Sequence, residues 1–128
     1  MQIDLLYKPS HTLARVVLQP GEGVRAESGA MVGMSPSLAL STDGPMAGGG
    51  FFKKLKRAVL SGETFFTNTF TATRAPGEVL LAPPLCGDMC VHDVRPGERL
   101  VIQGSNYVAS PDTIDVDTQF QGFRRFFS

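Results

Sequence analysis

The chain has 128 residues and a mass of 13.8 kDa, and its 12 basic and 12 acidic side chains leave no net charge at neutral pH. This length fits one domain, and the balanced charge argues against a nucleic-acid binder, whose domains are usually basic. Hydrophobic residues reach 42% and charged residues only 19%, which excludes a disordered chain and favours a globular protein with some surface hidden in an assembly.

The N-terminal residues lack the basic region and apolar core of a secretory signal. No apolar run approaches the ~18 residues that a membrane-spanning helix needs. Two cysteines are too few for the disulfide framework of a small secreted protein. We therefore expect a cytoplasmic protein.

Short apolar runs bounded by glycine and proline predict β-strands along the chain. In residues 64–72 the side chains of Phe66, Phe70 and Ala72 fall on one face and three threonines on the other, as in a half-buried strand. Many short strands with regular turns are typical of an all-β sandwich or barrel, so we expect one β domain over residues 1–128. The predicted strands cover residues 3–7, 13–18, 24 onward, 30–34, 38–42, 64–72, 79–81, 100–102 and 114–117.

The tripeptide Pro-Gly-Glu occurs three times, each time before an apolar run, with its glycine at Gly21, Gly77 and Gly97. Proline presets the backbone angle for the second position of a turn, and glycine supplies the positive φ that a type II turn needs next. The pattern predicts three type II turns, each leading into a strand.

Residues 51–60 interrupt the β pattern after three consecutive glycines. At 100° per residue the apolar side chains gather on one side and the basic ones on the other, which predicts a short amphipathic helix that stops near Gly62. One interpretation is that this helix covers an open end of the β-structure. The other is that it contacts an anionic membrane or a protein partner. RNA binding is not expected, because no RNA-binding motif is present. The candidate contact residues are Phe51, Phe52, Lys53, Lys54, Lys56 and Arg57.

Two parts of the chain also resemble each other in sequence. Residues 20–22, 30–36 and 50–55 align in the same order with residues 96–98, 105–111 and 122–127. We therefore predict an internal duplication, with a first repeat over about residues 13–87 and a partial second repeat over about residues 88–128. The second copy stops level with the start of the predicted helix, so we expect it to be incomplete.

Several motifs of the chain, taken together, resemble those of a known family. They are residues 23–32, the glycine run, residues 56–63, residues 77–84 and Gly87-Asp88. The family is the mitochondrial-biogenesis family of altered inheritance of mitochondria protein twenty-four, whose bacterial members are uncharacterised. The resemblance implies a fold similar to the tryptophan RNA-binding attenuator protein, built by duplication and found in homo-oligomers. It supplies no catalytic residues. Its eukaryotic members suggest a location at the periphery of the inner membrane.

Cys86, Cys90 and His92 are the residues that invite a metal or hydrolase interpretation. A zinc site usually needs a second ligand pair, and in a strand the two cysteines would lie ~13 Å apart. We therefore expect buried or half-buried thiols. A cysteine hydrolase is disfavoured, since no nucleophile elbow is present. The residues around Gly48-Gly49-Gly50 match no phosphate-loop motif. We expect no catalytic, cofactor-binding or metal-binding residues.

The sequence thus predicts a non-enzymatic, homo-oligomeric β-protein that acts as a scaffold or assembly module. The alternative is a module that binds a small ligand or lipid in its apolar interior near Ala82-Pro83-Pro84.

Overall fold

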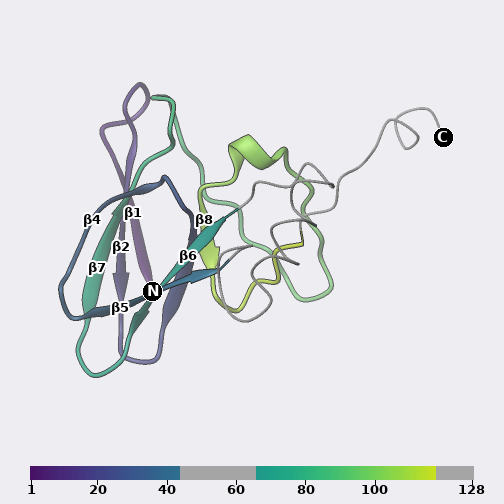
Figure 1. Cartoon of the computed structure of the whole chain (residues 1–128). Helices are drawn as coiled ribbons and strands as arrows, with labels where there is room; N and C mark the ends of the chain where they lie inside the picture. Colours follow the sequence, from purple (N-terminus) through teal and green to yellow (C-terminus); the bar gives the residue numbers. More distant parts are fainter. Residues whose placement is uncertain (44–65, 118–128) are drawn as a thin grey trace, which may run out of the picture.

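The computed structural model describes residues 1–43 and 66–117, and these residues form two four-stranded antiparallel sheets (Figure 1). The first sheet has the order β1 (Gln2–Leu6), β2 (Leu13–Leu18), β7 (Gly77–Leu81), β4 (Met31–Met34). The second has the order β5 (Leu38–Asp43), β6 (Thr67–Ala72), β3 (Gly23–Glu27), β8 (Ala109–Pro111). The only helical element of the described residues is a single 3-10 turn, η1 (Gly104–Asn106). The predicted all-β class is confirmed.

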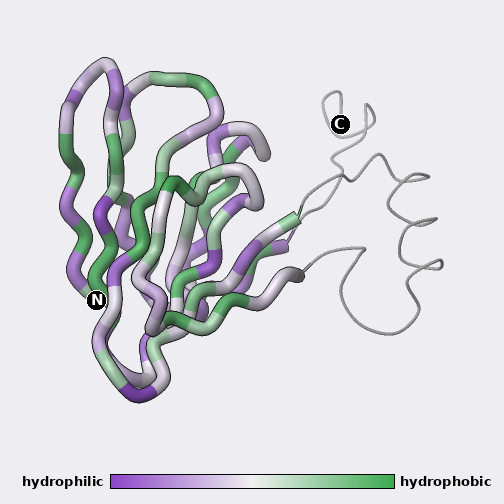
Figure 2. The backbone as a smooth tube through the Cα atoms, turned by 60° about the vertical axis from the view of Figure 1, so that its left-hand side comes forward, coloured by the Kyte–Doolittle hydropathy of each residue, from purple (hydrophilic) through white to green (hydrophobic). Residues whose placement is uncertain are grey.

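The core lies between the sheets because each central strand buries alternate side chains. In β2 these are Ala14, Val16 and Leu18, and polar and apolar residues alternate along the strands in Figure 2. One continuous cluster joins side chains from both sheets, and its largest fully buried members are Phe70, Leu18, Leu81 and Val79. The hydrophobic effect therefore holds the two sheets together across a single interior.

Two of the three predicted type II turns are confirmed. Gly21 and Gly97 have φ angles of +91° and +81°, and in both turns the N–H of the following glutamate donates to the carbonyl three residues earlier, at 2.9 Å. The third prediction is wrong. Gly77 is the first residue of β7, and a Cβ there would lie 2.5 Å from Leu38 Cδ2. Close packing, rather than a positive φ, requires glycine at this position.

The predicted strands at residues 100–102 and 114–117 are absent. Within the described part of the chain, the backbone of residues 99–102 forms no hydrogen bond, and β-forming side chains do not make a strand without a neighbouring ladder. Ile114 donates its N–H to the carbonyl of Pro111, so the chain turns after β8 instead of extending.

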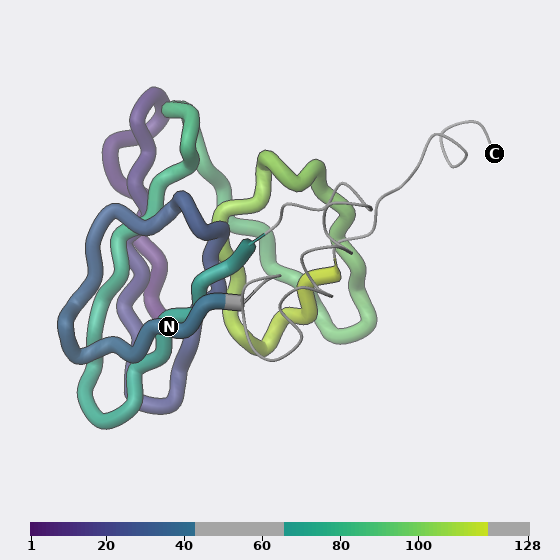
Figure 3. The backbone as a smooth tube through the Cα atoms, in the orientation of Figure 1, coloured from purple at the N-terminus to yellow at the C-terminus, as the bar shows by residue number. Residues whose placement is uncertain are grey.

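After β7 the chain runs to one side of the sheets and returns as β8, the green to yellow part of Figure 3. β8 pairs with β3 over three residues, and the Tyr107 hydroxyl donates to the Arg25 carbonyl at 3.1 Å. Burial raises the pKa of that hydroxyl above its ordinary value of 10.0. These contacts fasten the C-terminal part of the described chain to the second sheet.

Candidate functional site

The predicted contact helix falls outside the described residues. All six candidate contact residues lie within residues 44–65, which the structure does not describe: Phe51, Phe52, Lys53, Lys54, Lys56 and Arg57. The structure does give the two attachment points of this segment. Asp43 and Thr67 are partners at the end of the β5–β6 ladder, so both ends of the segment join the same end of the second sheet. A connection this long between neighbouring antiparallel strands is uncommon and often functional.

The environment of the two cysteines differs from the predicted one. Cys86 and Cys90 are free and exposed, so the expectation of buried thiols is wrong. The residues around them are not in a strand, so the separation expected for a strand does not apply. The cysteines lie at the two ends of a stretch whose middle is fastened to the start of β2.

Asp88 and Thr12 form that attachment. The Thr12 hydroxyl donates to Asp88 Oδ1 at 2.9 Å, and the Thr12 N–H donates to the Gly87 carbonyl at 3.0 Å. The N–H of Met89 also donates to Asp88, and this bond, followed by the one from Thr12, lowers the pKa of the carboxyl below its ordinary value of 3.8. Lys8 adds an ion pair at 3.8 Å.

Replacing Thr12 by valine is expected to raise the pKa of Asp88, because the ionised carboxylate loses a donor. A lowered folded-state pKa stabilises the protein above the unfolded-state value, and this contribution is lost as the pH falls through the folded-state value. The stability difference between wild type and Thr12→Val should therefore be larger at pH 7 than at pH 3. Carboxyl NMR titration and urea unfolding at both pH values measure it.

Thr42→Val is the matched control for this prediction. The Thr42 hydroxyl donates to the neutral amide of Asn68 at 2.9 Å, so its loss should not depend on pH in this range. An unchanged Asp88 titration in Thr12→Val would contradict the assignment of the hydrogen bond.

His92 does not join the cysteines. Its Nε2 lies 2.8 Å from Glu98 Oε1, and this hydrogen bond lowers the pKa of the glutamate. Within residues 1–43 and 66–117, no three histidine, cysteine, aspartate or glutamate side chains come together as ligands for one metal ion. The described helical turn is too short and too polar to span a membrane.

The stretch between β7 and η1 displays large apolar side chains. Leu85 and Val101 are each 84% exposed, and the others approach or exceed half exposure. The apolar pattern predicted a strand over three of these residues, but no feature of the sequence indicated that the stretch would be exposed. The exposed residues are Leu85, Val91, Leu100, Val101 and Ile102.

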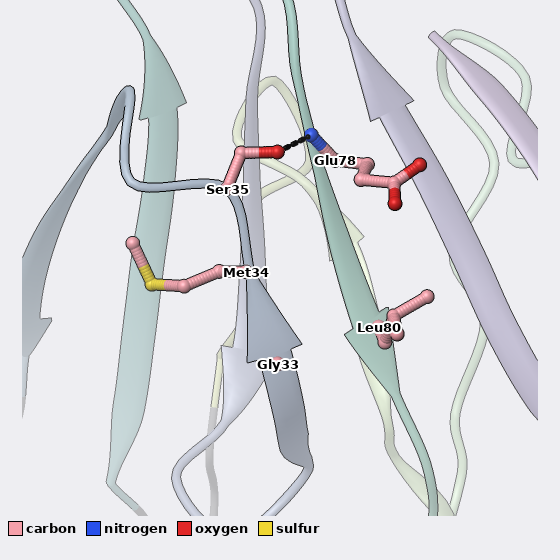
Figure 4. Close-up of a pocket in the computed structure, with 5 residues that line it drawn as sticks. All are labelled: Gly33, Met34, Ser35, Glu78 and Leu80. Carbon is pink, nitrogen blue, oxygen red and sulfur yellow. Dashed lines mark hydrogen bonds between the residues drawn. The ribbon is translucent and has the colours of Figure 1, made fainter.

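A shallow hollow of about 240 Å³ lies between β4 and β7, at Gly33, Met34, Ser35, Glu78 and Leu80 (Figure 4). The N–H of Glu78 donates to Ser35 Oγ at 2.9 Å, and the Glu78 carboxylate accepts from Arg15 Nε at 2.7 Å. The side chains of Ser35 and Glu78 in this hollow thus already have hydrogen-bond partners within the protein. The hollow is smaller than ligand pockets of about 300–1,000 Å³, and Ala82-Pro83-Pro84 does not line it.

Comparison with known proteins gives one family match. A family model described as mitochondrial biogenesis AIM24 matches residues 3–128. The crystal structure of protein SPYM3_0169 from Streptococcus pyogenes aligns with a TM-score of 0.49 and 21% identity. That alignment covers 65% of this chain and 38% of the streptococcal chain. A comparison with curated proteins gave no match.

Proposed function

The chain belongs to the mitochondrial biogenesis AIM24 family, and from this we propose that it is a non-enzymatic protein that self-associates and serves as a scaffold. We also propose that its two sheets belong to a fold similar to the tryptophan RNA-binding attenuator protein, with the predicted duplication over residues 13–87 and 88–128. The reducing cytoplasm is the proposed location, since both cysteines are free.

The observation that carries the scaffold proposal is the unpaired apolar stretch at residues 99–102. Leu100, Val101 and Ile102 are exposed, favour β-structure, and have backbone groups without hydrogen-bond partners among the described residues. Monomeric proteins rarely leave such apolar surface in water. A second copy of the chain can cover it, because β1, β4, β5 and β8 each pair on one side only within the described sheets. An unpaired strand edge readily accepts an extended segment from another chain.

Light scattering on size-separated protein tests this proposal. Wild type is expected to have a mass at least twice 13.8 kDa, and Val101→Glu is expected to shift it toward the monomer, because a charge would enter the apolar contact. Tyr7→Glu is the matched control, since Tyr7 is 71% exposed but lies in the bend after β1, outside the strands. A monomeric wild type would overturn the proposal, and dissociation by Tyr7→Glu alone would place the contact elsewhere.

The proposed scaffold contacts an anionic membrane surface through the basic segment at residues 51–60. Each Lys or Arg near such a surface contributes about 1 kcal/mol. Asp43 and Thr67, on either side of residues 44–65, are partners at one end of the second sheet, so the basic segment is attached to the fold at that end. Co-sedimentation with vesicles should rise with anionic lipid content and fall in Lys53→Glu/Lys54→Glu. If vesicle binding did not change with anionic lipid content, the proposed membrane contact would be contradicted, and the proposal of self-association would be unaffected.

A further inference from the structure

The exposure of both cysteines calls for a chemical explanation. Free cysteine is among the most buried residue types, because its thiol behaves as a small apolar group. Cys86 and Cys90 are nevertheless both exposed. Both thiols are therefore accessible as ligands.

The stretch between the cysteines is held in place. Gly87 and Asp88 are bound to Thr12, which is only 3% exposed, and Met89 packs against the core. Both thiols are thus attached to a segment that is fixed to Thr12 by two residues and to the core by a third. A fixed pair of ligands loses less conformational entropy on binding than a pair on a free loop.

The spacing of the two cysteines is that of a zinc ligand pair. Cys-x3-Cys falls within the two- to four-residue spacing of structural sites, in which thiolates hold zinc tetrahedrally. One chain supplies only two such ligands. The nearby side chains are already engaged, since Asp88 binds Thr12 and His92 binds Glu98.

A second copy related by a two-fold axis would supply the missing pair, because such an axis brings the same residues of both copies together. The residues next to the thiols suit this contact. Leu85 precedes Cys86, Val91 follows Cys90, and they are 84% and 54% exposed. Four thiolates around a divalent cation carry a net negative charge, and the ion pair of Lys8 with Asp88 adds no net charge to it in either copy.

We propose that Cys86 and Cys90 from two copies of the chain together bind one zinc ion and join the copies across a two-fold axis. The four thiols lose their protons to solvent as the sulfur–zinc bonds form. This bridge goes beyond the self-association proposed above, because it uses a different contact and a metal ion.

The test uses the full chain, reduced, stripped with a chelator and titrated with zinc. We expect saturation at about 0.5 zinc per chain, and a tetrahedral thiolate spectrum when cobalt replaces zinc. Cys86→Ser and Cys90→Ser should each abolish the zinc binding and the cobalt spectrum, because two serines would replace two of the four thiolates. His92→Asn is the control and should leave the stoichiometry and the spectrum unchanged. Loss of binding in His92→Asn, no binding by wild type, or one zinc per chain would overturn the proposal.

The same titration in Val101→Glu separates this bridge from the proposed scaffold contact. Zinc should double the mass of that variant, and a chelator should reverse the change. Failure of zinc binding in a wild type that still self-associates refutes the bridge alone. A monomeric wild type that binds 0.5 zinc per chain and then dimerises refutes the contact at residues 99–102 alone.

Discussion

Replacing Leu81 by alanine is expected to lower the free energy of unfolding by about 2–5 kcal/mol. Leu81 is fully buried at the end of β7, a central strand of the first sheet, where it pairs with Ala14 of β2 on one side and Met31 of β4 on the other. The cavity left by the side chain would open between the two sheets. Because small domains have only about 5–15 kcal/mol of stability, the loss would be a large fraction of the total.

Leu40→Ala is the matched control, since it removes the same atoms from a leucine that is 50% exposed on β5. We expect a loss of about 1 kcal/mol there, because half of the side chain already contacts water. Urea unfolding followed by circular dichroism measures both variants, which suits a chain without tryptophan. Equal losses in the two variants would show that Leu81 is not in a shared core.

Gly77→Ala is expected to destabilise the protein by about 1–3 kcal/mol, although it adds only one methyl group. The new Cβ would lie 2.5 Å from Leu38 Cδ2, 2.8 Å from Leu38 Cγ and 3.1 Å from Ser37 Oγ. Leu38 is 6% exposed and belongs to the second sheet, so it cannot move away without opening the core. One methyl group in β7 would therefore push the two sheets apart.

Gly33→Ala supplies the comparison for Gly77. Gly33 is also a strand glycine of the first sheet, but a Cβ there meets nothing within 4 Å. We expect its unfolding free energy to stay the same or to rise by about 0.4–1 kcal/mol, because alanine restricts the unfolded chain. In the double variant Gly77→Ala/Leu38→Ala, the loss should be smaller than the sum of the two single losses. Additive losses would mean that Leu38 is not the obstacle.

Local patterns predicted the central strands well. The bounds predicted for β2 are those observed, because its alternating apolar side chains suit a strand with one buried face and a partner on each side. Residues 100–102 carry an equally good apolar run but form no strand. A strand also needs a neighbouring strand to hydrogen-bond with, and the rest of the fold decides whether one lies alongside. The β-preference of individual residues cannot predict this.

The misjudged features depend on contacts between residues far apart in the sequence. Three identical Pro-Gly-Glu segments have two structural roles, because only Gly77 lies against Leu38. Asp88, between the two exposed cysteines, is held by Thr12 across 76 positions of the chain. The spacing of the cysteines was visible in the sequence, but this distant contact was not.

The order of the strands within the sheets has a consequence for cooperativity. Along the chain, β1 and β2 lie in the first sheet, β3 in the second, β4 in the first, β5 and β6 in the second, β7 in the first and β8 in the second. Within the described residues, no continuous stretch of chain therefore contains one whole sheet without strands of the other. Neither sheet can form or melt as a separate unit, so the protein should unfold in one all-or-none transition, and a single cut between β3 and β7 would divide both sheets at once.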